Sequence, residues 1–352
     1  MGRSPWPPSS WPRFEDVLDA RRAIAPYLRP TPVVTSLALD RLLGCRAFVK
    51  CENTNPTRAF KVRGGINLVS RLSPRERARG VITASTGNHG QSIAYAAALF
   101  GVRAIIGVPQ NANPVKLQAM RDFGAEIVEV GRDFDDAREW VERTAEAEGY
   151  RYVHSGNEPH LIAGVATSSL ELIETVPDLD VIVVPVGGGS GACGHTIAAK
   201  VVNPRIQIIG VQAAGAPAVY HSWKEGRWTS FETLSTRAEG LATRAPFALT
   251  LAMMRERLDD LVLVTDEEME EGIRILLETT GQVAELAGAA AVAAARRLVD
   301  RIAGLNVGLI LSGGNITMEA LRAILAGGQA ARRPPDPSCR VPMPSVQERS
   351  GD

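Results

Sequence analysis

The stretch Val181-Ile-Val-Val-Pro-Val-Gly187-Gly188-Gly189-Ser190-Gly191-Ala-Cys-Gly194 joins a short apolar run to a glycine-rich turn. An apolar run of this length indicates a buried strand, and the residues from His195 to Val202 have a helical pattern. Glycines let bare backbone N–H groups converge, and a helix N-terminus adds a favourable dipole. The segment therefore predicts a strand, a loop and a helix, with a loop that binds an anion such as a phosphate.

The same loop allows a second interpretation, because Gly189, Gly191 and Gly194 spell the G-x-G-x-x-G pattern of dinucleotide-binding sites. Such sites carry a carboxylate for the ribose about twenty residues further on, at the end of the next strand. Gln212 stands at that place, after the apolar run Ile206–Val211. We therefore favour a monophosphate over NAD, and a merely tight strand-to-helix turn is the structural alternative.

Further apolar runs alternate with longer helical patterns along the chain. Such runs indicate the buried parallel strands of an α/β fold. They are Ala104–Val108, Ile206–Val211, Leu261–Val264 and Val307–Leu311. A chain of 352 residues has room for about two domains of this kind. No repeat of fixed period is visible, which argues against solenoids and propellers.

The composition argues against several classes of function. Lys plus Arg is 39 and Asp plus Glu is 39, so no excess positive charge is available for nucleic acid or an anionic membrane surface. The sequence contains no apolar run long enough to cross a membrane and no signal-peptide pattern at its start. The cysteines and histidines lack metal-ligand spacing. We expect a cytoplasmic protein without a metal, a nucleic-acid partner or a membrane partner.

A second loop, Ser85-Thr86-Gly87-Asn88-His89-Gly90, follows the apolar pair Val81-Ile82 and precedes another helical pattern. Small hydroxyls, an amide and free N–H groups at a helix N-terminus again suit an anion. The alternative without a ligand is that these residues only cap the N-terminus of the helix.

A third segment reads Asn55-Pro-Thr-Arg58-Ala-Phe-Lys61-Val-Arg63-Gly-Gly65. Lys61 follows a proline-containing turn and has mostly small or apolar neighbours. Desolvation, together with Arg58 and Arg63, would lower the pKa of its amine and make it a nucleophile. A lysine on a solvated helix face is the commoner alternative.

With Ser312-Gly-Gly-Asn315, these segments resemble the tryptophan synthase β-like (fold type II) pyridoxal-phosphate enzymes, and the threonine and serine dehydratases are the nearest branch. That family carries a Ser-Phe-Lys-x-Arg-Gly motif, a Ser-Thr/Ser-Gly-Asn-His-Gly loop, a tetraglycine phosphate loop and a Ser/Cys-Gly-Gly-Asn motif, in this order. The resemblance covers about residues 20–328. It implies two three-layer αβα domains with mostly parallel sheets, and pyridoxal 5′-phosphate as the cofactor.

The resemblance also implies a role for each matching residue. Lys61 would bind the cofactor covalently and later take the Cα proton of the substrate. Asn88 would bond the phenolic oxygen, Phe60 would pack near the ring, and Ser312 would face the pyridine nitrogen. The phosphate would be held by Gly187, Gly188, Gly189, Ser190 and Gly191. The substrate carboxylate would be bound, largely through backbone groups, by Ser85, Thr86 and His89.

Some residues depart from the family pattern or match it only in part. Ala59 replaces the usual serine, and Arg58 replaces a glycine and adds a positive charge near the substrate, so the exact substrate stays open. Ser190 replaces the fourth glycine of the phosphate loop, where a hydroxyl can donate to phosphate. Glu285 matches a family carboxylate that would lie near the site, and a buried structural carboxylate is the alternative. About forty residues follow Ser312, so we expect no C-terminal regulatory domain of the kind that biosynthetic threonine dehydratases carry.

We predict a β-elimination enzyme that converts L-threonine to 2-oxobutanoate and ammonia, and L-serine to pyruvate. The predicted catalytic residues are Lys61, Thr86 and Ser85. Serine racemisation or β-replacement on the same cofactor is an alternative. Two alternatives come from other functional classes. One is an NAD-binding oxidoreductase, and the other is a protein descended from these enzymes that binds a ligand without catalysis. We also expect a homo-oligomer.

The predicted organisation has four parts. They are an N-terminal tail (1–19), a large cofactor-binding domain (20–79 and 156–330), a small mobile domain (80–155) and a disordered tail (331–352). Some members of the family hold a divalent cation with carboxylates just after the strand that matches Ile206–Val211. Gln212 and Ala218 stand at those positions, so we expect no metal site.

Overall fold

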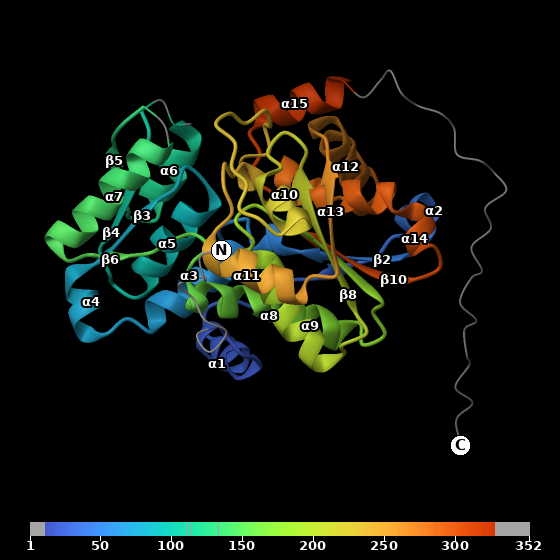
Figure 1. Cartoon of the computed structure of the whole chain (residues 1–352), viewed down its shortest axis with the longest axis horizontal. Helices are drawn as coiled ribbons and strands as arrows, with labels where there is room; N and C mark the ends of the chain where they lie inside the picture. The colour runs from blue at the N-terminus through green and yellow to red at the C-terminus, as the bar shows by residue number, and fades with distance from the viewer. Residues whose placement is uncertain (1–10, 111, 113, 133, 328–352) are drawn as a thin grey trace.

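The computed structural model describes residues 11–110, 112, 114–132 and 134–327. Two sheets lie beside one another along the longest axis of the molecule (Figure 1). The larger sheet has the strand order β1-β2-β10-β7-β8-β9, and all its neighbouring strands are parallel except β1 and β2. Its strands are β1 (Val33–Val34), β2 (Arg46–Cys51), β7 (Val181–Pro185), β8 (Gln207–Ala213), β9 (Asp260–Val264) and β10 (Asn306–Leu311).

The smaller sheet is wholly parallel and has the order β5-β4-β3-β6. Its strands are β3 (Val81–Ala84), β4 (Ala104–Val108), β5 (Glu126–Glu129) and β6 (Arg151–Tyr152). Parallel strands need crossover connections, and helices supply them here. These helices are α5 (Asn88–Leu99), α6 (Pro114–Asp122) and α7 (Phe134–Glu148). The short helix α4 (Pro74–Arg79) precedes β3.

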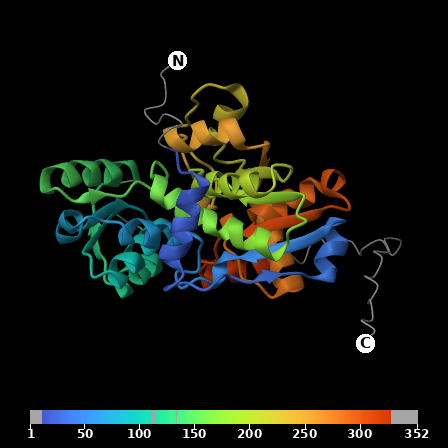
Figure 2. The same cartoon turned by 90° about the horizontal axis from the view of Figure 1, so that it is seen from below.

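Helices cover both faces of the larger sheet (Figures 1 and 2). Val181 and Val183 of β7 pack in the cluster that includes α12 and α13, whereas Ile182 and Val184 pack in the cluster that includes α8 and α9. A strand with both faces buried must be apolar at every position, which explains the continuous run in the sequence. The longer helices of this part are α1 (Phe14–Ile24), α3 (Lys61–Ser70), α8 (Pro159–Thr175), α9 (Ser190–Val202), α11 (Ala248–Arg257), α12 (Asp266–Thr280), α13 (Leu286–Arg297) and α15 (Met318–Gly327).

Short helices complete the larger part. They are α2 (Leu37–Leu43), α10 (Ala218–Glu225), α14 (Val299–Ile302), η2 (Glu52–Thr54) and η3 (Glu239–Leu241). Local signals set the ends of the elements, as α12 illustrates. The Thr265 hydroxyl accepts from the Glu268 N–H, the Glu268 carboxylate bonds back to the Thr265 N–H, and Gly281 ends the helix with a φ of 67°.

The structure confirms the predicted α/β class with two parallel sheets and corrects two boundaries. Residues 14–19 are not part of a tail, because they belong to α1, where Val17 is fully buried and the helix packs against α8. The helix after the glycine-rich loop begins at Ser190 and not at His195. The predicted tail 331–352 lies outside the described residues, and the domain division at residues 80 and 155 stays a prediction.

Candidate active site

The carboxyl ends of β2, β10 and β7 meet at one edge of the larger sheet because these strands are neighbours. The segments that follow them carry Lys61, Ser312 and Gly187 respectively. Ligands of open parallel sheets bind at this edge. The topology therefore brings together three segments that are far apart in the sequence.

Lys61 is the first residue of α3, and it is partly buried. Its Nζ donates to Ser190 Oγ over 2.9 Å and lies 5.3 Å from the centre of the Phe60 ring. Burial lowers the pKa of the Lys61 amine to about 8. A fraction of the amine is therefore neutral at physiological pH, as a nucleophile or a base requires.

Arg63 does not contribute to this pKa shift, contrary to the expectation from sequence, and neither does Arg58. The Arg63 guanidinium points away from Lys61 and is fully buried between two carboxylates. Its Nε lies 2.7 Å from Glu52 Oε2, and its Nη1 lies 2.6 Å from Glu171 Oε1. Its positive charge is therefore neutralised within this buried cluster.

The two glycines after Arg63 explain how α3 is held so tightly. A Cβ on Gly64 would lie 2.8 Å from the Leu161 carbonyl oxygen, and one on Gly65 would lie 2.4 Å from Ser92 Oγ. Only glycine permits this close approach to α8 and α5. The Ser92 hydroxyl also donates to the Lys61 carbonyl over 2.6 Å. These contacts fix the first turn of α3 and hence the start of the Lys61 side chain.

The loop after β7 is built to hold an anion. Five consecutive backbone N–H groups, from Gly187 to Gly191, donate to no acceptor among the described residues. They lie at the N-terminus of α9, whose dipole favours negative charge. Side chains could not be added here, because a Cβ on Gly187 would lie 2.2 Å from the Gly240 carbonyl oxygen and one on Gly188 would lie 2.3 Å from Phe247 Cε2. This donor set fits the phosphate of pyridoxal phosphate.

The loop after β3 forms a second group of free donors. Ser85 Oγ accepts from the Gly90 N–H over 2.9 Å and from the Gly87 N–H over 3.2 Å, which shapes the turn. The backbone N–H groups of Thr86, Asn88 and His89 donate to no described residue. The Thr86 hydroxyl likewise makes no hydrogen bond within the described chain. These groups suit a carboxylate.

The side chain of His89 does not point toward a substrate. Its Nε2 lies 3.0 Å from Thr83 Oγ1 and 3.3 Å from the Val153 carbonyl oxygen. Burial lowers the pKa of His89 to about 3, so the ring is neutral. Any contact of His89 with a carboxylate is therefore left to its backbone N–H.

Asn88 connects the two sheets at the site. Its Nδ2 donates to Glu285 Oε1 over 2.6 Å, and its Oδ1 accepts from Asn315 Nδ2 over 2.7 Å. Burial raises the pKa of Glu285 to about 7, although the bond from Asn88 opposes this shift. Glu285 thus lies near the site, in line with the first of its two interpretations from sequence, a carboxylate near the site as opposed to a purely structural one.

Ser312 is buried beside Phe60, whose N–H donates to the Ser312 carbonyl over 3.0 Å. Its hydroxyl is 3.4 Å from the Ala287 carbonyl oxygen, a weak bond that a better acceptor could displace. A cavity of about 260 Å³ lies next to these groups. The polar residues that line it are Lys116, Arg237, Glu239, Glu285, Asn315 and Thr317.

Three contributors to the site were not assigned a role from sequence. Asn315 belongs to the motif Ser312–Asn315, but only the structure shows its contact with Asn88. Phe247 packs against the glycine-rich loop and, at 4.7 Å between ring centres, against His154. Lys116 of α6 forms an ion pair with Glu239 of η3. Sequence spacing carries no signal for contacts over such separations.

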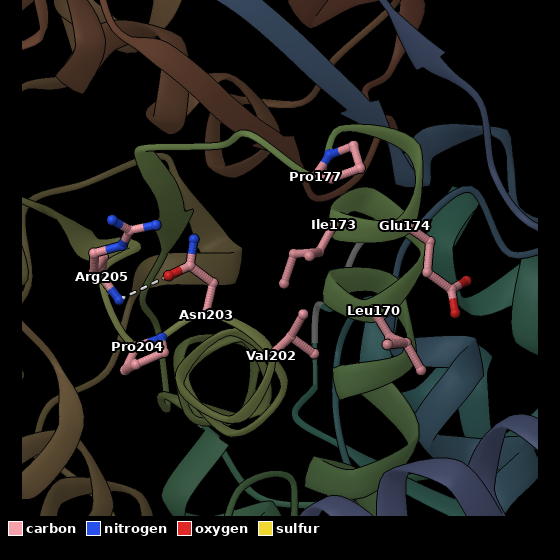
Figure 3. A pocket seen from close by; sticks show the side chains of 8 residues that line it. All are labelled: Leu170, Ile173, Glu174, Pro177, Val202, Asn203, Pro204 and Arg205. Atoms are coloured by element: carbon pink, nitrogen blue, oxygen red, sulfur yellow. Dashed lines mark hydrogen bonds between the residues drawn. The ribbon is translucent and has the colours of Figure 1, made fainter.

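A separate groove of about 670 Å³ lies between the C-terminal ends of α8 and α9 (Figure 3). Its walls include Leu170, Ile173 and Val202, with Glu174 and Arg205 at the edges. None of the candidate site residues lines it. We therefore place the chemistry at the segments that carry Lys61, Ser85 and Gly187, and not at this groove.

The fold and site define an α/β protein in which a partly buried lysine amine lies beside a glycine-rich loop with free backbone N–H groups. The family of pyridoxal-phosphate dependent enzymes matches residues 24–313. The chain belongs to this family of pyridoxal-phosphate dependent enzymes. The expected cofactor class is thereby confirmed.

Individual relatives agree with this assignment. An L-threonine ammonia-lyase from Thermotoga maritima is 39% identical, over 90% of this chain and 78% of the relative. An L-threo-3-hydroxyaspartate ammonia-lyase from Saccharomyces cerevisiae is 36% identical, over 90% of this chain and 97% of the relative. The solved structure of maize serine racemase has a TM-score of 0.84 and 31% identity, and covers 90% of this chain and 97% of that one. These likenesses confirm the tryptophan synthase β-like fold.

Proposed function

We propose that this chain catalyses the pyridoxal-phosphate-dependent β-elimination of a small β-hydroxy amino acid. L-threonine would give 2-oxobutanoate and ammonia, and L-serine would give pyruvate and ammonia. The observation that carries the proposal is the Lys61 amine, which burial keeps partly neutral and which bonds Ser190 at 2.9 Å beside the free amides of the glycine-rich loop. The L-threonine ammonia-lyases of Thermotoga maritima and Geobacter sulfurreducens, 39% and 38% identical, support the choice of substrate.

The residues of this chain divide the work between binding and proton transfer. The N–H groups from Gly187 to Gly191 would hold the cofactor phosphate, and those of Thr86, Asn88 and His89 would hold the substrate carboxylate. Bound pyridoxal phosphate withdraws electrons from the Cα of the amino acid, which labilises the Cα proton and the β-hydroxyl. Lys61 Nζ would then accept the Cα proton, since a base with a pKa near the working pH is the most effective.

Three further residues would orient the cofactor. Phe60 lies beside the Lys61 amine and would pack near the ring, and Asn88 would bond the phenolic oxygen with the amide hydrogen that it does not give to Glu285. Ser312 would face the pyridine nitrogen. A hydroxyl there cannot stabilise a positive charge as a carboxylate does, so electron withdrawal is moderated and elimination is favoured over slower side reactions.

We also propose that residues 80–155 act as a small domain that closes over the substrate, because they contain the whole four-stranded sheet and the Ser85 loop. Closure would exclude water from the reacting atoms. Contacts that would adjust during closure include the bond from Asn88 to Glu285 and the ion pair of Lys116 with Glu239. A change in protease sensitivity of the 80 and 155 boundaries on addition of a non-reactive substrate analogue would test this movement.

The proposed reaction is tested with the purified protein loaded with pyridoxal phosphate. Incubation with L-threonine or L-serine should release ammonia and 2-oxo acid in equal amounts. The variant K61A should release neither, while its circular dichroism spectrum stays that of the wild type. Equal activity of K61A and wild type would refute the proposal.

Racemisation of serine on the same cofactor is a second candidate function. It is favoured by one observation, the unbonded hydroxyl of Thr86, which could return a proton to Cα. The serine racemase of Schizosaccharomyces pombe is 32% identical to this chain. Chiral analysis of the products from L-serine separates the two functions, because racemisation yields D-serine and elimination yields pyruvate.

The expected homo-oligomer and cytoplasmic location remain predictions. No helix among the described residues is long and apolar enough to cross a membrane. Light scattering of the purified protein would give the mass of the particle, which should be a multiple of the 37.7 kDa chain.

A further inference from the structure

Arg58 adopts a backbone conformation that arginine rarely takes. It is the only residue other than glycine in the described part of the chain with a positive φ, at 55°. An L-residue with a side chain loses about 1 kcal/mol or more in this region. The conformation is held on both sides, because the Arg58 N–H donates to the Asn55 carbonyl over 2.7 Å and the Gly314 N–H donates to the Arg58 carbonyl over 2.8 Å.

The turn that carries Arg58 is hydrogen-bonded to Asn315, one of the residues that line the cavity beside Glu285. Asn315, which lines the cavity, donates through Nδ2 to the Thr57 carbonyl over 2.9 Å and to Asn88 Oδ1 over 2.7 Å. On the other side of Arg58, Ala59 forms a β-bridge with Gly313. The position of Arg58 is thus fixed relative to the residues proposed to bind substrate and cofactor.

Arg58 acts electrostatically on Glu285, one of the residues that line the cavity. It lowers the pKa of this partly buried carboxyl, against the larger effect of burial, which raises that pKa. Lys116, on another wall of the cavity, acts on Glu285 in the same direction. Arg58 itself does not line the cavity, but its carbonyl accepts from Gly314, which precedes the lining residue Asn315.

The two cations that line the cavity already have partners. Lys116 is paired with Glu239, and Arg237 lies 2.6 Å from Glu270. Arg58 is exposed, and its guanidinium forms no ion pair or hydrogen bond with any residue that the structure describes. The site thus has beside it a strained, exposed cation that is available to an incoming anion.

We propose that Arg58 binds a second carboxylate, carried by the side chain of the substrate. The enzyme would then accept a β-hydroxy amino acid with an acidic side chain, L-threo-3-hydroxyaspartate, alongside L-threonine. The fork of N–H groups on a guanidinium matches the two oxygens of a carboxylate. The methyl group of threonine offers no acceptor, so with that substrate the guanidinium would stay hydrated. Two relatives, 36% and 34% identical, are named L-threo-3-hydroxyaspartate ammonia-lyases. This inference rests on the proposed β-elimination.

The reaction balances without an added oxidant. The Cα–H and Cβ–O bonds of 3-hydroxyaspartate break, a carbon–carbon double bond forms, and water leaves. The resulting enamine tautomerises, and water then hydrolyses it to oxaloacetate and ammonia. The water consumed equals the water released, so the products are one oxaloacetate and one ammonia for each substrate.

The test compares the wild type with R58G and R58K, all loaded with pyridoxal phosphate. Oxaloacetate formed from L-threo-3-hydroxyaspartate and 2-oxobutanoate formed from L-threonine are measured to obtain kcat/KM for each substrate. The quantity compared is kcat/KM for L-threo-3-hydroxyaspartate divided by kcat/KM for L-threonine. R58G should lower this ratio by about tenfold or more, mainly through a higher KM for the acidic substrate, as expected for one lost charge-assisted hydrogen bond. R58K should retain part of the ratio, because it keeps the charge but loses the fork.

R58G is a suitable variant because glycine adopts a positive φ without strain, so its melting temperature should equal or exceed that of the wild type. R41A is the matched control, since Arg41 is an exposed arginine on α2, and no residue of α2 lines the cavity. It should leave the ratio of the two kcat/KM values unchanged. The inference would be overturned if R58G and the wild type had the same ratio. It would also be overturned if the wild type turned over threonine but not hydroxyaspartate. Either result would leave the proposed function standing. A wild type inactive on both substrates would overturn both.

Discussion

The Nδ2 of Asn88 donates to the Oε1 of Glu285 over 2.6 Å, which joins the first residue of α5 to the residue just before α13. This bond links the loop that follows β3 of the smaller sheet to a residue that lines the cavity. Burial raises the pKa of Glu285 to about 7, so its charge depends on pH in the physiological range. The bond therefore joins a loop proposed to bind substrate to a carboxyl that titrates near neutrality.

We expect stability of the cofactor-free protein to depend on pH through Glu285. Its pKa is higher in the folded state than the usual 4.5, so the folded protein binds more protons than the unfolded chain between about pH 4.5 and pH 7. This contribution is present below that window and is lost as the pH rises through it. The free energy of unfolding of E285Q should not fall with pH across this window, because glutamine does not titrate. The difference in free energy of unfolding between the wild type and E285Q should therefore change by up to roughly 3 kcal/mol across the window. Urea titrations at several pH values measure it. A constant difference would contradict the pKa assignment.

Lys61 should carry the cofactor. Borohydride reduction of the loaded protein should fix the cofactor to a peptide that contains Lys61, and K61A should lose this adduct together with ammonia release. Peptide mapping by mass spectrometry gives the site. K200A is the matched control, since Lys200 bonds Asp259 and the Ile206 carbonyl away from the site. Label on Lys116 or Lys200 would show that the site is misassigned.

Thr86 should favour elimination over racemisation. A racemase needs an acid on the face of the substrate opposite Lys61, and the methyl group of threonine restricts χ1 and crowds the approach of its hydroxyl. We expect the wild type to form far more pyruvate than D-serine from L-serine, and T86S to raise the share of D-serine several-fold. Chiral chromatography of the reaction mixture measures both. D-serine as the main product of the wild type would refute this expectation.

Chelators should not affect activity. Gln212 is fully buried, and its Oε1 accepts from the Tyr220 N–H over 2.8 Å, so a neutral amide makes the contact between β8 and α10 where a carboxylate could hold a cation. No cluster of three or more metal-ligating side chains occurs among the described residues. Activity and melting temperature should be the same with EDTA and with added Mg²⁺. A several-fold loss in EDTA that Mg²⁺ restores would show that a metal site exists.

Arg63 should be among the costliest residues to replace. Burial opposes the charge of Glu52, yet the adjacent Arg63 lowers the pKa of that carboxyl to about 2. R63M would leave the carboxylates of Glu52 and Glu171 without their shared partner and should lower the free energy of unfolding by about 3–5 kcal/mol. The double variant R63M/E52Q should lose less of the free energy of unfolding, because it removes one buried charge of each sign. Urea denaturation of the wild type and the two variants measures these free energies. An equal loss in both variants would contradict the pairing of Arg63 with Glu52.

Local sequence patterns predicted much of the secondary structure and the three loops. The run Ala104–Val108 forms a strand with those limits, because every position of a doubly covered parallel strand must be apolar. Gly187–Gly191 could be predicted as an anion loop because glycine acts through its own backbone. The helix boundary at Ser190 was missed, since a glycine-rich first turn carries no apolar periodicity.

Local patterns were enough to predict the succession of strands, helices and glycine-rich loops along the chain, because each of these depends on neighbouring residues. Which distant groups meet follows from the packing of the folded chain, as for Asn88 with Glu285, and for Arg63 with Glu52 and Glu171. This packing also decided that His89 turns inward and that burial, without help from Arg63, lowers the pKa of Lys61. Burial and long-range pairing arise from packing in three dimensions, and residue spacing does not encode them.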